Sequence, residues 1–185
     1  YADIVDLMYV VPFGRFLRNS HRWGAHAMVI TVSIHMFRVF LTGSYKPPRQ
    51  FNWVVGVILL VLTFLLSFTG YLLPWDQLAY WAVTVGTSLL EYFPLIGSAV
   101  RKVLIGGEEV NANTLLIFFN FHTAVLPILI LLLMAYHFWS VRKVGGIMLP
   151  KKVDEKKMIP VYPNLIYQEF IVALVLIAVV LTFSV

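Results

Sequence analysis

Four histidines form two pairs of similar spacing in this chain. His21 and His35 lie fourteen residues apart in RNSHRWGAHAMVITVSIHMFR, and His122 and His137 lie fifteen apart in TLLIFFNFHTAVLPILILLLMAYHFW. In an α-helix these separations correspond to about 40° and about 60° of rotation, and to rises of about 21 Å and about 22 Å. Each pair therefore shares one broad face of a helix, at two depths.

Two helices with such pairs can clamp two planar cofactors, one above the other. Haem fits this arrangement, because its iron takes two axial imidazoles and its propionates pair with arginines. Arg18 lies one turn before His21, and Arg38 lies one turn after His35. Ionisable groups inside membrane spans are costly and usually functional. We therefore predict that the paired histidines ligate two haems, whereas His26, about 180° from His35, packs or is solvated.

The composition indicates a membrane protein. The chain has 185 residues, of which 60% are hydrophobic, and a soluble domain of this length does not need so much apolar surface. It has no cysteine, which excludes disulfides, iron–sulfur ligation and thioether-attached haem within it, so the two haems are expected to be non-covalent. Tyr1 at the first position predicts a processed chain or part of a longer polypeptide.

The hydropathy pattern predicts an all-α transmembrane bundle of four spans, with the two haems between the first and third spans. Residues 1–20, interrupted by Pro12 and Gly14, are expected to form a short amphipathic surface helix. Residues 70–112 are too polar to span and are expected to form short interfacial helices. The expected spans are residues 21–42, 53–73, 114–140 and 165–184.

Two further features lie inside the expected spans. Gly56 and Gly70 are fourteen residues apart and so share a face of the second span. Glycines there allow a neighbouring helix or a flat cofactor ring to approach closely, which makes both candidates for cofactor contact. Pro127 is expected to kink the third span, which a bundle tolerates.

The charge distribution predicts the topology. The loops at residues 43–50 and 142–157 are both basic, which favours placing them on the electronegative side of the membrane. The first and third spans then run parallel. His21 is therefore expected to pair with His122 towards the positive side, and His35 with His137 towards the negative side.

Several motifs together resemble cytochrome b of the quinol-oxidising bc and bf complexes. They cover nearly the whole chain, and LPWDQ with the fifteen-residue histidine spacing is most similar to the bf type and its bacterial menaquinol relatives. YPNLIYQEF resembles the start of the first helix of the bf complex's companion subunit. We therefore divide the chain into a haem-binding core (1–143), a basic connecting loop (144–160) and a fourth span (161–185). The motifs are R-x-x-H-R-W…H-x-x-R (18–38), GYLLPWDQLAYWAV (70–83), PLIGS (94–98), FHTAVLP (121–127) and HFWSVRK (137–143).

The resemblance implies a di-haem subunit of a quinol–cytochrome c or plastocyanin-type reductase, not active by itself. Quinol would be oxidised near the positive side, with one electron leaving to an iron–sulfur protein and the other crossing through both haems to a quinone at the negative side. Arg18 and Arg38 would meet haem propionates. Part of the quinol-oxidation pocket would be lined by Tyr71, Pro74, Trp75 and Asp76.

The same resemblance implies partners and a location. It implies a Rieske-type iron–sulfur protein, a c-type cytochrome subunit, further membrane chains that complete the cytochrome b, and a homodimeric complex. The membrane would be a bacterial inner membrane or a thylakoid-type membrane. The family carries a span before residue 1 and a segment after the fourth span that completes the oxidation site, so these are expected from another chain or from further sequence.

Three alternatives remain open at this level. Asp76 follows Pro74, so it is a candidate cap for a short helix as well as a candidate proton acceptor for quinol. The chain is also compatible with the haem anchor of another membrane dehydrogenase, such as a formate or nitrate enzyme. The third alternative is a channel, transporter or structural bundle with histidines facing a water-filled cavity. Such a protein would be colourless, whereas a cytochrome b and the haem anchor of a dehydrogenase are both coloured.

Overall fold

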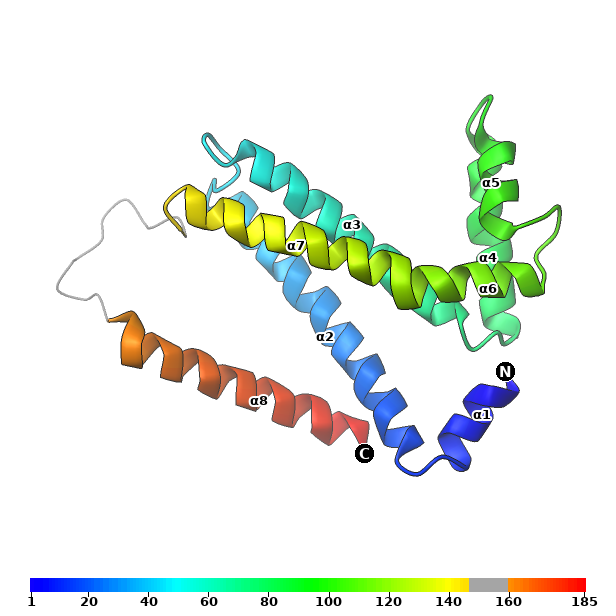
Figure 1. Ribbon diagram of the computed structural model, residues 1–185, viewed down its shortest axis with the longest axis horizontal. Coiled ribbons are helices and arrows are strands. Elements are labelled where there is room, and N and C mark those ends of the chain that lie inside the picture. Colours follow the sequence, from blue (N-terminus) through cyan, green and yellow to red (C-terminus); the bar gives the residue numbers. More distant parts are fainter. Residues whose placement is uncertain (147–159) are drawn as a thin grey trace. The chain divides into compact units, whose positions relative to one another are not determined.

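The computed structural model describes residues 1–146 and 160–185, which form helices joined by turns (Figure 1). Four helical segments are long and apolar enough to cross a membrane. The predictions of an all-α fold and of four spans are therefore confirmed. The segments are Gly14–Leu41, Gln50–Leu72, Ala112–Lys143 and Tyr162–Ser184.

The described residues form two compact units. The first comprises Tyr1–Ile4 and Phe51–Ser140, and the second comprises Val5–Gln50 and Val141–Val185. Most of the predicted basic loop, residues 147–159, lies outside the described residues. The division of the chain at residues 143 and 161 stays a prediction.

The first unit contains the second and third spans. The second span is α3 (Gln50–Leu72), and the third is built from α6 (Ala112–Asn120), η2 (Phe121–Val125) and α7 (Leu126–Lys143). The ring of Phe51, at the start of α3, meets Tyr136 edge-on at 5.9 Å, and that of Phe68 meets Phe118 at 6.3 Å. The start of α3 thus faces the end of the third span, so these two spans run antiparallel.

Between these spans lie α4 (Gln77–Ser88), η1 (Leu89–Tyr92) and α5 (Gly97–Ile105). The prediction of short helices in residues 70–112 is confirmed. Pro74 lacks an amide proton and cannot continue α3, and Asp76 caps α4. α5 ends at Gly106, whose φ of 72° suits a residue without a Cβ.

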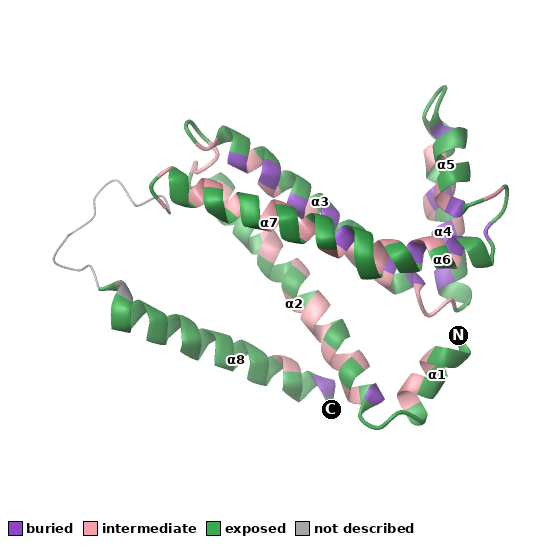
Figure 2. Cartoon of the chain, in the orientation of Figure 1, coloured by how far each residue is buried: buried purple, intermediate pink, exposed green. Residues whose placement is uncertain are grey.

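A buried cluster of this unit lies at the C-terminal end of α3, and further buried residues follow along that helix (Figure 2). The cluster joins the last residues of α3 to α4, α5 and α6. Thr114 is fully buried there: its hydroxyl donates to the Ile105 carbonyl at 2.6 Å and accepts the Asn111 N–H at 3.1 Å. The short helices are therefore packed onto both spans. The core residues are Leu72, Ala79, Val83, Ile105, Val110 and Phe118.

Two ion pairs lie in this region. The guanidinium of Arg101 lies 3.2 Å from Glu91, and Lys102 forms an ion pair with Glu108. These contacts link η1, α5 and the loop that follows α5.

The second unit contains the last residues of α1 (Ala2–Tyr9), from Val5 onward, and the first span, α2 (Gly14–Leu41). The short N-terminal helix was predicted, but the expected start of the first span at residue 21 is wrong. Gly14 begins α2 instead of interrupting the chain. Phe13 turns with a φ of 59°, and a Cβ at Gly14 would collide with the Leu7 carbonyl, so the chain reverses tightly there.

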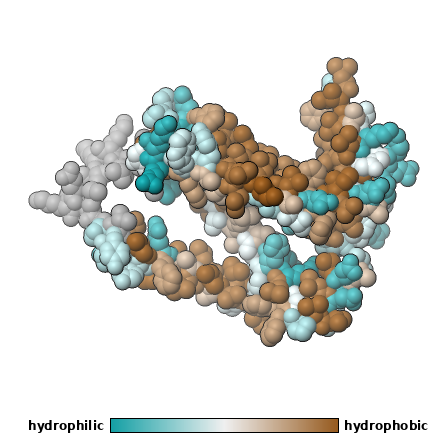
Figure 3. Space-filling view, in the orientation of Figure 1, coloured by the Kyte–Doolittle hydropathy of each residue, from teal (hydrophilic) through white to brown (hydrophobic). Residues whose placement is uncertain are grey.

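The fourth span, α8 (Ile166–Ser184), follows η4 (Val161–Leu165) and packs against α2 within this unit. The amide of Asn19 donates to the Ser184 carbonyl at 3.3 Å, and the rings of Trp23 and Phe183 lie 5.0 Å apart. Most of α8 is exposed, and Figure 3 shows hydrophobic side chains along its visible face. Such a surface requires lipid or further protein around it.

Candidate functional site

His122 is the predicted ligand whose surroundings are defined most fully. Its Nδ1 lies 3.0 Å from the carbonyl oxygen of Leu66 and 3.2 Å from the hydroxyl oxygen of Thr69, both on α3. The Thr69 hydroxyl itself donates to Leu66 at 3.0 Å, so Nδ1 carries the proton in this arrangement. A neutral imidazole with a protonated Nδ1 has a lone pair on Nε2, which is the form that binds a metal.

Gly70 lies directly against the same imidazole. A Cβ at this position would be 2.5 Å from Cε1 and 3.1 Å from Nδ1 of His122. Only glycine therefore allows α3 to approach the ring this closely. The ring that lies against Gly70 in the structure is an imidazole from the neighbouring span. Contact of Gly56 or Gly70 with a cofactor stays a prediction.

The helix around His122 is not a regular α-helix. Residues Phe121–Val125 form a π-helical turn, in which the N–H of Leu126 donates to the Phe121 carbonyl. Pro127 follows immediately. A widened turn thus lies just before Pro127, which is one of the ways in which membrane helices accommodate proline. The kink at Pro127 stays a prediction.

The other predicted ligands lie on the spans where they were expected. His137 is on α7, next to Tyr136, which meets Phe51 at the opposite end of α3 from Gly70. His21 and His35 are both on α2. The histidines of α2 and those of the third span belong to different compact units, so their pairing across the spans stays a prediction.

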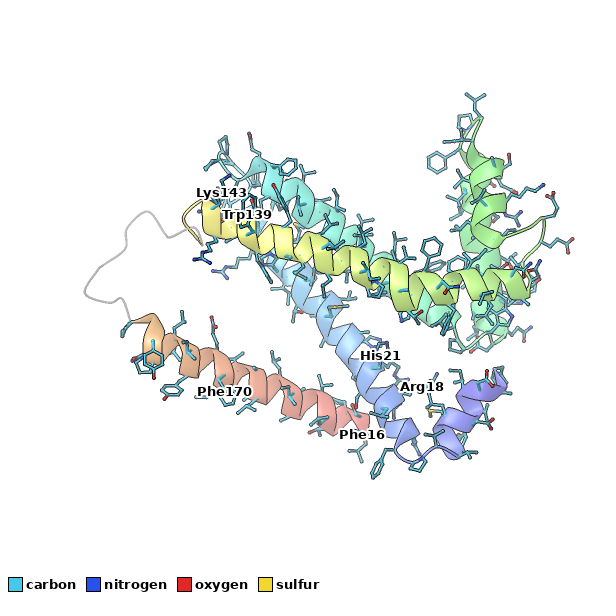
Figure 4. All side chains as sticks on the ribbon, viewed as in Figure 1. Phe16, Arg18, His21, Trp139, Lys143 and Phe170 are labelled. Atoms are coloured by element: carbon cyan, nitrogen blue, oxygen red, sulfur yellow. The ribbon has the colours of Figure 1, made fainter. Side chains whose placement is uncertain are left out.

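The two predicted propionate partners are also on α2. Figure 4 shows Arg18 and His21 one turn apart on this helix. The guanidinium of Arg18 lies 3.4 Å from the sulfur of Met8, which links α2 to the N-terminal segment. Arg38 lies in the last turn of α2, where its carbonyl accepts the N–H and the hydroxyl of Thr42.

His26 differs from His122 in how its ring is held. Its Nδ1 lies 2.7 Å from the Arg22 carbonyl, one turn earlier on the same helix, and its ring tilts against Trp23. The side chain is exposed. That His26 packs or is solvated and does not ligate a haem stays a prediction.

Asp76 is the cap of α4. Its Oδ1 accepts the Ala79 N–H at 2.8 Å, which confirms the capping interpretation. Trp75 precedes it with a φ of 52° and rests edge-on against Tyr80. Trp75 also packs on the buried core, so the turn that presents Asp76 is held from both sides.

An apolar groove of about 490 Å³ opens beside α5. Phe121 of the π-helical turn forms one of its walls. The four residues predicted to line the quinol-oxidation pocket do not line this groove, so their role stays a prediction. The remaining lining residues are Ile96, Ala99, Val100, Val103 and Leu104.

The sequence was compared with those of known proteins. A family model described as cytochrome b(N-terminal)/b6/petB matches residues 26–185. Cytochrome b6 of Gracilaria tenuistipitata var. liui is 46% identical over 145 residues, which cover 78% of this chain and 67% of that protein. Cytochrome b6 of Synechococcus elongatus is 45% identical over the same length. The chain belongs to the cytochrome b family.

A solved structure agrees with this membership. A chain of a hyperthermophilic respiratory Complex III superimposes with a TM-score of 0.83 at 30% identity, covering 98% of this chain. This cytochrome b spans about half the length of that solved chain, 52%. With four apolar helices, it is an integral membrane protein, and its family implies haem b as the cofactor.

The residues around His122 fit a haem ligand. Ligating histidines almost always donate their second ring N–H to a carbonyl, carboxylate or water, which fixes the tautomer and the ring orientation. In this cytochrome b the Leu66 carbonyl accepts that hydrogen bond, and Gly70 leaves room for the ring. Among residues 1–146 and 160–185, no group of three His, Asp or Glu side chains is placed to hold a metal ion. Haem iron requires only two imidazoles from the protein.

Sequence reasoning did not identify Leu66 and Thr69. Leu66 acts through its backbone carbonyl, which no side-chain pattern reveals. Thr69 left one weak signal, a hydroxyl directly beside Gly70 in a mostly apolar span. Membrane threonines usually bond to their own helix, and the link to His122 appears only when α3 and the third span are packed together.

Proposed function

We propose that this chain is the di-haem cytochrome b subunit of a quinol:electron-acceptor oxidoreductase. It carries electrons between a quinol-oxidation site on the positive side of the membrane and a quinone-reduction site on the negative side. Family membership supports this proposal. The observation that carries it is the bond from Nδ1 of His122 to the Leu66 carbonyl at 3.0 Å, which is the contact that metal-ligating histidines make with their second ring nitrogen.

The ligand assignment follows the topology inferred from the sequence. His21 and His122 hold one haem b towards the positive side, and His35 and His137 hold a second towards the negative side, both without covalent attachment. Bound haem supplies one-electron transfer. The protein orients the imidazoles, excludes water with its apolar spans and supplies compensating positive charge. Gly56 and Gly70 allow close approach to the cofactor.

Arginines and the turn after α3 complete the site. Arg18 and Arg38 pair with propionates at the two depths, each one turn beyond its histidine. Tyr71, Pro74, Trp75 and Asp76 form part of the quinol-oxidation pocket. Because Oδ1 of Asp76 accepts the Ala79 N–H, Oδ2 is the atom that receives a proton or a hydrogen bond from quinol.

The complex around this chain is part of the proposal. A Rieske-type iron–sulfur protein accepts one electron, and a c-type cytochrome or a plastocyanin-type protein follows it. Further membrane chains complete the cytochrome b and its quinol sites. The whole assembly is a homodimer, and this chain is not active by itself.

Haem stoichiometry in the isolated native complex tests the proposal. A reduced-minus-oxidised spectrum is expected to show b-type haem at two per chain. Replacing His137 by leucine should remove one haem and leave the other, and the same holds for His35. A ratio of one haem per chain, or a colourless complex, contradicts the proposal. The subunit composition of the same preparation identifies the iron–sulfur and c-type partners.

A further inference from the structure

The two histidine pairs differ by one residue, and in regular helices that difference is large. In an α-helix, fourteen residues rotate the chain about the helix axis by about 40° less than four turns, whereas fifteen residues rotate it by about 60° more than four turns. The second histidines of two regular α-helices would therefore point about 100° apart. In a left-handed bundle fourteen residues are two heptads, and Gly56 and Gly70 have this spacing as well. The fifteen-residue pair is the exception.

The π-helical turn lies inside that pair. In Phe121–Val125 the hydrogen bond from Leu126 reaches back five residues instead of four. A π-turn thus holds about one residue more than an α-turn. His122 is the second residue of this turn, so most of the extra residue falls between His122 and His137. The fifteen residues therefore rotate the chain by nearly the amount that fourteen produce in an α-helix, about 40° short of four turns.

Pro127 prevents the turn from tightening into an α-helix. In an α-helix its nitrogen would donate to the Thr123 carbonyl, but proline has no N–H and its ring collides with that carbonyl. The hydroxyl of Thr123 donates to the Phe119 carbonyl at 2.8 Å, on the N-terminal side of the turn. His122 is fixed in addition by Leu66 on α3. The widened turn is thus held at both ends.

We propose that Pro127 and the π-helical turn before it position His137. The widened turn accommodates the extra, fifteenth residue. His137 therefore points in nearly the direction, relative to His122, that a spacing of fourteen residues gives in a regular α-helix. This inference rests on the proposed function, in which both histidines are haem ligands. Pro127 is a positioning residue that acts through the helix and through His137.

Two deletion variants distinguish the orientation of His137 about the helix axis from its distance along the sequence from His122. Removing Ala124 together with Pro127→Ala leaves His122 and His137 fourteen residues apart in a regular α-helix. Removing Leu131 also leaves fourteen residues but keeps Pro127 and the π-turn, so His137 rotates by about 100°. Ala124 and Leu131 are both exposed, Leu131 at 71%, so neither deletion removes a core side chain.

The deletions are compared in the complete complex by haem content per chain and by the midpoint potential of each haem. The variant that combines the Ala124 deletion with Pro127→Ala is expected to retain two haems. The Leu131 deletion is expected to lose the haem of His137 and to retain that of His122, which also shows that the chain has assembled. If both deletions keep two haems, or both lose the same haem, the proposal is overturned.

A full-length variant covers the case in which the Leu131 deletion does not assemble. Pro127→Ala keeps all 185 residues and allows the turn to tighten. We expect a changed low-spin ferric resonance for the haem of His137, with that of His122 unchanged, and the added Ala124 deletion should restore it. An unchanged resonance in Pro127→Ala overturns the proposal. If His137→Leu keeps both haems, the proposed function fails instead.

Discussion

Nδ1 of His122 lies 3.0 Å from the carbonyl oxygen of Leu66, and this contact joins the third span to α3. The acceptor is a backbone atom, so no single substitution removes it. The neighbouring Thr69 hydroxyl, 3.2 Å from the same nitrogen, can be removed. The ring of His122 can therefore be tuned from α3 without changing the ligand.

Thr69→Val is expected to keep both haems and to raise the midpoint potential of the haem at His122. Loss of one acceptor at Nδ1 makes the imidazole a weaker donor to iron, which favours the reduced state. We expect a rise of roughly 20–60 mV, where 59 mV is a tenfold change for one electron. Potentiometric titration measures it. Thr63→Val is the matched control, because the Thr63 hydroxyl bonds within its own helix; an equal shift in both variants would contradict the prediction.

Gly70→Ala is expected to lose the haem at His122. The new Cβ would lie 2.5 Å from Cε1 of the ring, so the imidazole or the helix must move. The haem held by His35 and His137 should remain, and haem per chain should fall from two to one. Gly86→Ala is the control: its Cβ meets the end of the Phe68 side chain at 3.1 Å, and that ring can turn. Two haems in Gly70→Ala would show that the close approach is unimportant.

Arg18→Gln and Arg38→Gln should each lower the potential of a different haem. The positive charge of a guanidinium disfavours the oxidised haem, because the oxidised haem carries one positive charge more than the reduced haem. Loss of the guanidinium should therefore lower the midpoint potential by roughly tens of millivolts. Arg22→Gln serves as the comparison, since Arg22 lies over the Trp23 ring, 5.6 Å from its centroid. Potentials unchanged in both test variants would make Arg18 and Arg38 ordinary interfacial arginines.

Asp76 can be tested for capping and for proton transfer separately. Asp76→Ala removes the cap and is expected to destabilise α4 by about 1 kcal/mol, seen as faster amide exchange in its first turn. Asp76→Asn keeps most of the cap and removes the charge. If Oδ2 receives the quinol proton, Asp76→Asn slows quinol oxidation while haem reduction from the negative side persists. Unchanged turnover and pH dependence in Asp76→Asn would exclude the proton role.

Thr114→Val should lower the stability of the first unit by about 1–3 kcal/mol. The substitution leaves the Ile105 carbonyl and the Asn111 N–H without the hydroxyl that bonds both in a fully buried position. Thermal unfolding of the purified complex, or exchange at the start of α6, measures the loss. Thr84→Val is the control, because the Thr84 hydroxyl is exposed and bonds only to Tyr80 one turn earlier.

The sequence was sufficient for features that depend on local chemistry. Apolar runs bounded by charges predicted the four spans, and Pro74 followed by Asp76 predicted the end of α3 and the cap of α4. The start of α2 was predicted too late, because Gly14 was interpreted as a break. In the structure this glycine is needed because the Leu7 carbonyl lies close to it. A contact of this kind depends on how the chain folds back and cannot be predicted from the residues next to Gly14.

The site was predictable in its side chains and not in its backbone. Histidine and arginine spacing identified candidate ligands. The π-helical turn was missed because Pro127 predicts only that the hydrogen-bond ladder is interrupted, and not whether the helix bends or widens. The Leu66 carbonyl was missed for the related reason that its availability to His122 depends on how α3 packs against the third span.

The location of the buried core has a consequence for how the chain is made. Leu72 and Val83 are translated before Ile105, Val110 and Phe118, yet all are packed in one cluster. α4 and α5 have 12 and 9 residues, too few for a stable isolated helix in water. At about 5–20 residues per second, the nascent chain therefore exposes this apolar segment for seconds, until α6 leaves the ribosome. Chaperones and the insertion machinery have to shield it during that interval.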